Sequence, residues 1–212
     1  MKNLLTTTNL QAGIRLWHWD RDFHNEYYQQ LSRWKQNGLN EAWWWQIVDE
    51  LAKWKATRGQ TKHQIGVRGV ERLKRLQAPY NQIIGSTAGR PLNLTTATWQ
   101  PLEELYSVAF DIKHIDSPVF GSKLCHFILP NAFPVFDHAV IGDSLRSIGV
   151  HIHTYEEYWR FCKAQWTECS EQEALRQEMQ LAIGKAVHAD YPYSTKVTEL
   201  CISSIPKKSA CR

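Results

Sequence analysis

The sequence of 212 residues lacks any apolar run approaching 18 residues, the length at which a membrane-spanning helix is expected. Its first eight residues, Met1–Thr8, contain no apolar core of the kind that a signal peptide needs. We therefore expect a cytoplasmic protein with no membrane partner.

Cysteine is scarce and present in an odd number: Cys125, Cys162, Cys169, Cys201 and Cys211. Their wide spacing favours reduced thiols over a disulfide framework. An iron–sulfur cluster needs four suitably placed thiolates, and the spacing excludes one. The short cluster His151–His153 lacks a third ligand, so we expect solvated histidines and no metal site.

Alternating strand patterns are nearly absent, and this absence predicts an all-α fold. Asn40 and Thr98 are suitable N-caps, and Thr154–Glu157 and Ser170–Glu173 are capping-box patterns. Gly59, Gly66 and Gly69 are expected to loosen the chain before a short basic helix, and residues 78–98 to form a loop or linker. The expected helices are 24–35, 40–55, 70–76, 99–112, 122–128, 138–147, 154–167, 170–188 and 194–205.

The length allows one generous domain or two small lobes. We expect two lobes: an aromatic-rich and basic helical region over 1–95 and a second helical region over 96–212. The alternative is that both regions form one compact unit.

The charge is distributed unevenly along the chain. Residues 1–80 carry 13 Lys/Arg against 7 Asp/Glu, whereas the remainder carries 12 against 14. Eight of the basic residues lie between Lys53 and Arg75, with Glu71 as the one acid. Such a stretch suits a polyanion, with Arg68, Arg72 and Arg75 as candidate DNA contacts, or it forms a solvated helix face.

The most informative stretch is Gly121-Ser122-Lys123, followed fourteen residues after the lysine by Asp137 in Phe133-Pro134-Val135-Phe136-Asp137-His138. A carboxylate held among apolar neighbours at the start of a helix can stabilise positive charge in a reaction. Asp137 can also serve simply as the N-cap of the helix that begins near His138.

These residues resemble the helix-hairpin-helix DNA glycosylase superfamily. Gly121 matches the second hairpin glycine, Lys123 the residue after the turn, and Asp137 the family's acid. Val119 stands where the first hairpin glycine is expected, and the interval to Asp137 is shorter than usual. The resemblance implies a two-lobed helical fold in which the amides of Gly121 and Ser122 bind DNA phosphate, sometimes through a monovalent cation, with no other cofactor.

The resemblance also implies hydrolysis of the bond between base and sugar after the base has left the duplex stack. Asp137 would stabilise the sugar cation and orient water. Lys123 has three interpretations: the nucleophile of an abasic-site lyase, a phosphate contact, or a solvated lysine in the first helical turn.

A flipped base needs aromatic walls and polar edges. The aromatic candidates in the N-terminal half can equally be core residues; they are Trp17, Trp19, Trp43, Trp45, Tyr27 and Tyr28. Our expected pocket residues are Trp43, Trp45 and His138, the last of which can instead bond only to the backbone.

The leading expectation is a monomeric DNA glycosylase acting on double-stranded DNA. Its base is unassigned, and a bulky modified base of viral DNA, as in phage defence, is one option. The alternative is a non-catalytic protein that binds nucleic acid or a protein partner, which the missing glycine and the short interval favour.

Overall fold

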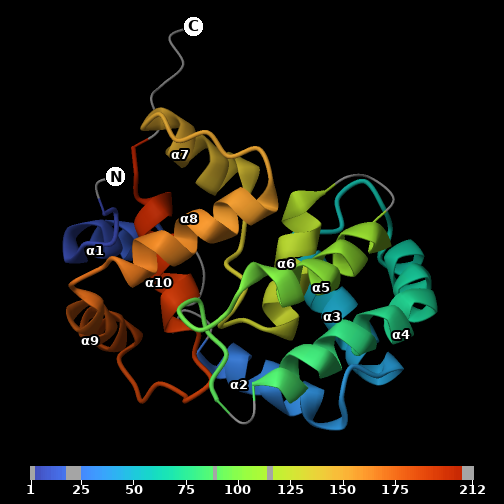
Figure 1. The fold of residues 1–212 in the computed structure, drawn as a ribbon. Helices are drawn as coiled ribbons and strands as arrows, with labels where there is room; N and C mark the ends of the chain where they lie inside the picture. Colours follow the sequence, from blue (N-terminus) through green and yellow to red (C-terminus); the bar gives the residue numbers. More distant parts are fainter. Residues whose placement is uncertain (1–2, 18–24, 88–89, 114–116, 207–212) are drawn as a thin grey trace, which may run out of the picture.

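The computed structural model describes residues 3–17, 25–87, 90–113 and 117–206, and within these ranges the chain forms helices and connecting segments without strands (Figure 1). The predicted all-α class is confirmed. No helix in the described ranges is both long and apolar enough to cross a membrane. The helices are α1 (Thr7–Leu16), α2 (Asn25–Trp34), η1 (Lys35–Asn37), α3 (Glu41–Lys53), α4 (Lys62–Ser86), α5 (Trp99–Ile112), α6 (Pro118–Ile128), η2 (His138–Gly142), α7 (Asp143–Ser147), α8 (Tyr155–Thr167), α9 (Gln172–Ile183) and α10 (Tyr193–Ser203).

Side chains cap the helices at two of the four predicted positions, whereas Thr98 precedes α5 without a side-chain capping bond. The Asn40 side chain accepts a hydrogen bond from the Trp43 amide, and Thr154 accepts one from the Glu157 amide. The expectation at Ser170 is wrong, because α9 begins at Gln172 after Glu171, whose side chain makes no capping bond. The same helix ends at Ile183 rather than near His188, because Gly184 adopts a left-handed conformation that stops it.

Helix α4 corrects the prediction of loosening glycines, a short helix over 70–76 and a linker from residue 78. It runs unbroken from Lys62 to Ser86, through Pro79, after a capping box formed by Thr61 and Gln64. Gly66 and Gly69 are sites of close packing against α3. A Cβ atom on Gly66 would lie 2.0 Å from the ring of Trp45, and one on Gly69 would lie 1.8 Å from the ring of Trp44.

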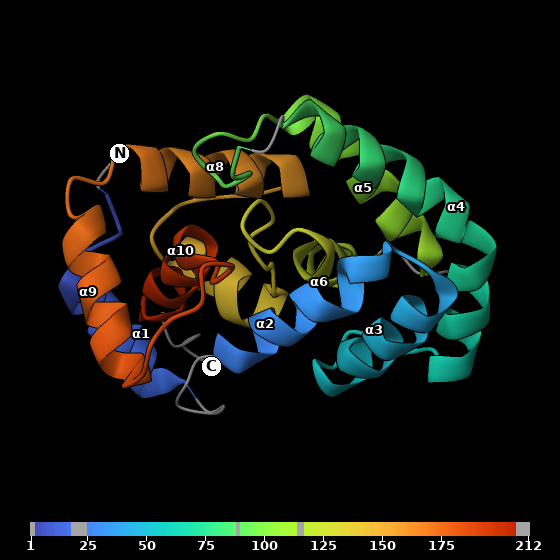
Figure 2. The same ribbon diagram turned by 90° about the horizontal axis from the view of Figure 1, so that it is seen from below.

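The expected boundary near residue 95 does not separate two packing units. Helix α4 packs against α5 across it, and the N-terminal α1 packs against α9 and α10 near the other end of the chain. Figures 1 and 2 show α1, α9 and α10 together, with α3, α4 and α5 at the opposite end. One cluster of buried hydrophobic side chains connects both regions.

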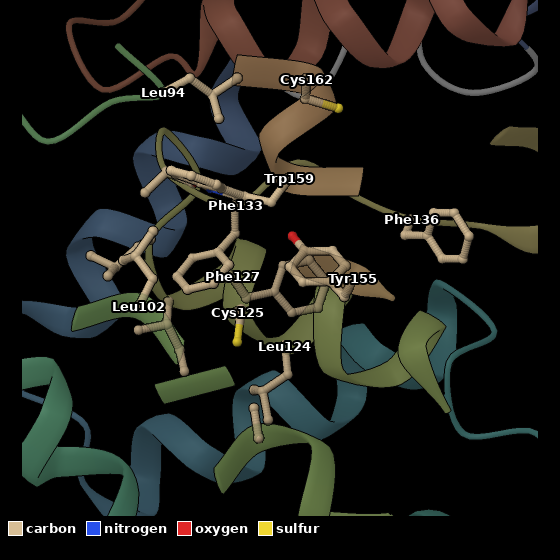
Figure 3. Close-up of a cluster of buried hydrophobic side chains, with 14 of the residues drawn as sticks. Leu94, Leu102, Leu124, Cys125, Phe127, Phe133, Phe136, Tyr155, Trp159 and Cys162 are labelled. Atoms are coloured by element: carbon tan, nitrogen blue, oxygen red, sulfur yellow. The ribbon is translucent and has the colours of Figure 1, made fainter. Parts of the chain in front are cut away.

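An aromatic cluster forms the centre of this core. Its members include Phe127, Phe133, Tyr155 and Trp159, which lie close together in Figure 3. None of these side chains is more than 5 % exposed. Tyr155 also stacks on Tyr106 of α5, with ring centroids 4.4 Å apart. Burying aromatic rings of this size removes much apolar surface from water and stabilises the junction of α5, α6 and α8.

The four cysteines in the described ranges are buried free thiols: Cys125, Cys162, Cys169 and Cys201. Cys211 lies outside those ranges. Burial raises the pKa of the Cys201 thiol to about 12, so the thiol form predominates at neutral pH.

Candidate active site

Residues 132–137 form neither helix nor strand, and they lead through the core to Asp137. A buried segment without regular secondary structure needs other partners for its backbone groups. Side chains of α6 and α8 supply them at four consecutive carbonyl oxygens. Trp159 Nε1 donates to Ala132 O at 2.8 Å, His126 Nδ1 to Phe133 O at 2.7 Å, Tyr155 Oη to Pro134 O at 2.7 Å and Tyr158 Oη to Val135 O at 2.9 Å.

The tautomer of His126 follows from its two contacts. A carbonyl oxygen can only accept, so Nδ1 carries the proton that Phe133 O receives. In the neutral ring, Nε2 then accepts from the hydroxyl of Tyr28, 2.6 Å away. Tyr28 is 1 % exposed, so this tyrosine supports α6 from the core and is not a pocket wall.

Ser122 binds the backbone of Phe136, the residue before Asp137. Its side chain is fully buried, and its Oγ accepts a hydrogen bond from the Phe136 amide at 3.1 Å. The hydroxyl proton faces Val119 O at 3.1 Å and Phe136 O at 3.2 Å. Ser122 is bonded to Phe136, and each of them is followed in the sequence by one member of the charged pair. The bond therefore brings Lys123 and Asp137 together.

Lys123 and Asp137 form the centre of the candidate site. Lys123 Nζ lies 3.5 Å from Asp137 Oδ2 and 2.8 Å from the carbonyl oxygen of Trp54. The side chain of Lys123 is 9 % exposed, which shows that its interpretation as a solvated lysine is wrong, whereas that of Asp137 is 34 % exposed. The pair therefore consists of a buried amine and a carboxylate that solvent reaches.

Asp137 is an N-cap as well as a partner of the lysine. Its Oδ1 accepts a hydrogen bond from the Ala139 amide at 3.1 Å, at the start of η2. The cap interpretation is confirmed, and it leaves Oδ2 turned to Lys123. The two interpretations of this carboxylate are therefore compatible in one geometry.

The surroundings of Lys123 lower its pKa below that of a lysine in water, which favours the neutral amine. Burial is the largest influence and lowers the pKa of Lys123, while the carboxylates of Asp137 and Glu199 oppose the shift. The nearby Arg58 guanidinium lowers the pKa further. An amine with a lowered pKa beside a carboxylate is suited to attack an electrophilic carbon.

A second charged pair, which the sequence analysis missed, lies on α10. Lys196 Nζ is 2.6 Å from Glu199 Oε2, and the Lys196 side chain is fully buried. The same ammonium lies 4.5 Å from the ring centre of Trp17 and 5.8 Å from that of Trp54. Trp54 therefore contacts both lysines, Lys123 through its carbonyl oxygen and Lys196 through its ring. A lysine and a glutamate three residues apart are usually a surface pair, so no local signal selects them.

The position of Gly121 corrects the predicted hairpin. Helix α6 begins at Pro118, not at Ser122, because Ser117 caps it and proline suits its first position. The Gly121 amide donates to Ser117 O at 3.0 Å inside the helix. A Cβ on Gly121 would lie 3.1 Å from Tyr106, so the small residue serves the packing of α5 on α6.

Gly121 and Ser122 thus lie in a helix rather than in a turn, and the buried hydroxyl of Ser122 faces the protein. The connection between α5 and α6 is residues 113–117. Residues 114–116 lie outside the described ranges. The monovalent cation was expected at the amides of Gly121 and Ser122, and the first of these amides is bonded to Ser117 O inside the helix.

The predicted DNA contacts on α4 are engaged with neighbouring protein groups. Arg68 Nη1 donates to Ile112 O at 3.2 Å, and Arg75 Nη2 lies 3.7 Å from Asp111. Arg72 lies 3.7 Å from Glu71. Arg68 and Arg75 thus contact α5, and a role for the three arginines in binding DNA stays a prediction.

The expected pocket residues do not surround the pair. Trp43 is 1 % exposed in the core, which corrects its assignment as a pocket wall. Trp45 stacks on His63 with ring centroids 6.5 Å apart, on the face of α3 that meets α4. His138 is exposed beside Asp137, and the centroids of the His138 and Phe136 rings lie 4.8 Å apart in an edge-to-face arrangement.

Other aromatic residues lie at the site instead. Tyr27 stacks on Trp54 with ring centroids 5.9 Å apart, and Trp17 lies over Lys196. Both were among the aromatic candidates, whereas Trp54 was expected only as a helix residue. Trp19 lies outside the described ranges.

Comparisons with family models, with curated proteins and with solved structures find no match to this chain. What supports a function is therefore the placement of Lys123, Asp137 and the side chains around them.

Proposed function

We propose that the chain is a DNA N-glycosylase of the helix-hairpin-helix type, which excises a damaged or modified base as a monomer on double-stranded DNA in the cytoplasm. One observation carries the proposal: Lys123 Nζ lies 3.5 Å from Asp137 Oδ2, so a buried amine meets a carboxylate that solvent reaches. The order of these residues in the sequence resembles that of the family, and the fold brings them into contact.

Asp137 would stabilise the sugar during cleavage. As the bond from C1′ to the base breaks, C1′ and the ring oxygen gain positive charge. A fixed carboxylate near that charge lowers the energy of the transition state. The Ala139 amide holds one oxygen of Asp137 in place, which leaves the other to face the sugar or to orient a water molecule.

Lys123 would add a lyase step. Its neutral amine attacks C1′, the bond from C1′ to the base breaks, and the base leaves with the electron pair and takes up a proton. Opening of the sugar ring then gives a Schiff base between Nζ and C1′. The lowered pKa of Lys123 supports this role, because the neutral amine is the nucleophile.

Borohydride trapping tests the lysine. The reagent reduces the Schiff base to a stable protein–DNA adduct, and we expect this adduct with the wild-type chain on DNA that contains an abasic site. Lys123→Ala should abolish it. Lys35→Ala is the matched control, because burial also lowers the pKa of Lys35, to about 8, and its Nζ is also bonded to a backbone carbonyl, Ile128 O at 2.6 Å.

Base release tests the aspartate independently. Asn caps helices about as well as Asp, so Asp137→Asn keeps the bond to Ala139 while removing the charge. We expect excision to fall by about 10²- to 10⁴-fold with little change in stability. Full activity of this variant on a substrate that the wild type cleaves would exclude the proposed mechanism.

The substrate is found with a panel of duplexes carrying alkylated, oxidised and bulky modified bases, including DNA from phages with hypermodified bases. Mass spectrometry of the released base names the product. DNA binding without base release across the panel would instead support the non-catalytic alternative.

A further inference from the structure

The loop that follows α3 ends that helix in an unusual way. The Ala56 amide donates to Leu51 O at 2.8 Å and the Lys55 amide to Ala52 O at 2.9 Å. These two bonds form a Schellman motif, in which the residue after the cap adopts a left-handed conformation. Here that residue is Lys55, with φ 56°.

Glycine is the residue favoured at such a position, because a Cβ atom makes the left-handed conformation unfavourable. The chain follows this rule elsewhere in its described part, where the other residues with positive φ are Gly38, Gly59, Gly149 and Gly184. Lys55 is the exception. A strained backbone position that keeps a costly side chain points to a use for that side chain.

The charge of Lys55 is available to a ligand. Lys55 and Arg58 are both exposed, and within the described ranges neither forms an ion pair. Their basic neighbours differ in this respect, because Lys53 pairs with Glu50 and Lys62 pairs with Asp49. The loop therefore presents two cations that no carboxylate of the described residues neutralises.

The same loop is attached directly to the candidate active site. The peptide unit that joins Trp54 to Lys55 accepts the hydrogen bond from Lys123 Nζ at 2.8 Å. One residue later, Ala56 O accepts from Lys113 Nζ at 2.9 Å. Two buried lysines thus hold the backbone on either side of Lys55, and Arg58 is close enough to Lys123 to influence its pKa.

A purely structural use of Lys55 is the competing explanation. A cation near the C-terminus of a helix interacts favourably with the helix dipole. Lys53, in the last turn of α3, already provides such a charge without the strained conformation. The dipole alone therefore gives no reason to keep a lysine at the left-handed position.

We propose that Lys55 and Arg58 form an anion-binding loop that contacts the phosphodiester groups next to the nucleotide held at Lys123 and Asp137. This inference rests on the proposed function, since it takes DNA as the ligand of the site. It assigns the main phosphate contact to the loop after α3 rather than to Gly121 and Ser122.

Binding of a defined probe tests the loop. The probe is a short DNA duplex with a tetrahydrofuran abasic-site analogue, followed by fluorescence anisotropy at several salt concentrations. Lys55→Gly should weaken binding by roughly 3- to 10-fold and reduce the salt slope by about 1, and addition of Arg58→Gln should reduce it by about 2 in total. Lys55→Arg should bind as the wild type does.

Stability measurements separate the two uses of Lys55. Because glycine relieves the strain, Lys55→Gly should leave Tm unchanged or raise it by up to about 4 °C while it weakens binding. Arg176→Ala is the control for charge, since α9 lies at the opposite end of the molecule from α3 (Figure 2); it should leave binding and salt slope unchanged.

Three results would overturn the inference. If Lys55→Gly lowers Tm and binds the probe as tightly as the wild type, Lys55 is structural. If Lys55→Gly leaves both the affinity and the salt slope unchanged, the loop does not touch phosphate, while the proposed glycosylase stands on its own tests. If the wild type binds no DNA at low salt, both the loop contact and the proposed function fail.

Discussion

The hydroxyl of Ser122 accepts a hydrogen bond from the Phe136 amide at 3.1 Å, and this bond sets the register in which the following residues meet. Lys123 and Asp137 face each other because the pair before them is aligned. A buried serine thereby determines the geometry of two charged side chains without touching either charge.

Ser122→Ala should lower both stability and activity. The substitution leaves the buried Phe136 amide without its acceptor, which costs about 1–3 kcal/mol of unfolding free energy. A shift of about 1 Å at Asp137 should reduce base excision by about 10²-fold. Ser203→Ala is the control, because Ser203 Oγ donates only to Leu200 O within α10; urea unfolding and excision assays should place it near the wild type.

Lys123→Met should stabilise the chain at neutral pH while it abolishes trapping. Because burial lowers the pKa of Lys123 relative to the unfolded chain, the folded protein bears a penalty whenever this lysine is charged. Removing the charge while keeping the apolar stem should raise the free energy of unfolding, because the partner left behind, Asp137, is reached by solvent and is not a buried unpaired charge.

The lowered pKa of Lys123 also predicts how the difference in unfolding free energy between Lys123→Met and the wild type varies with pH. Between the lowered pKa and 10.5, the unfolded chain binds more protons at this lysine than the folded chain does, so wild-type stability rises with pH. The advantage of Lys123→Met over the wild type should therefore shrink across this window in thermal melts. A difference that stays constant with pH would contradict the assigned burial effect.

Glu199→Ala should be among the most destabilising substitutions at the site. It leaves the fully buried ammonium of Lys196 without its carboxylate, which costs about 3–5 kcal/mol. Adding Lys196→Met should recover most of the loss, since no buried charge is then left unpaired. Glu26→Ala is the control, because its pair with Lys185 is exposed and worth at most about 1 kcal/mol. Equal losses in the two single variants, measured by urea unfolding, would contradict the prediction.

Two glycines of α4 should respond oppositely to alanine. A Cβ on Gly69 would meet the ring of Trp44 at 1.8 Å, so Gly69→Ala should destabilise by about 1–3 kcal/mol. A Cβ on Gly85 meets nothing within 4 Å, and Gly85→Ala should stabilise by about 0.5–1 kcal/mol through helix propensity. Thermal unfolding of the two variants makes the comparison within one helix.

Local rules predicted the elements whose signals are local. The absence of strand alternation gave the helical class, and Asn40 and Thr154 gave two helix starts that the structure confirms. The same rules failed where packing against another helix determines the structure. Gly66, Gly69 and the composition of residues 78–98 suggested a broken α4. The two glycines instead make room for the indole rings of Trp44 and Trp45, and the helix continues through Pro79.

The charged groups of the site also fall into two classes, those that a local sequence pattern indicates and those that only burial indicates. Lys123 and Asp137 were selected from a local pattern of turn, helix and cap, of which the cap at Asp137 is confirmed and the turn at Gly121 is wrong. Lys196 and Glu199 carry no such pattern, since their significance comes from burial beside Trp17 and Trp54, which lie far away in the chain.

The sequence by itself determined that the chain is helical, that a basic stretch lies in its first half, and that Asp137 caps a helix. Only the tertiary structure decided that Asp137 meets Lys123, that Trp54 contacts both buried lysines, and that Trp43 belongs to the core. The physical reason is that caps and periodicity depend on hydrogen bonds within a few residues. Burial, ion pairing and pKa shifts depend on which distant side chains exclude water from the same place.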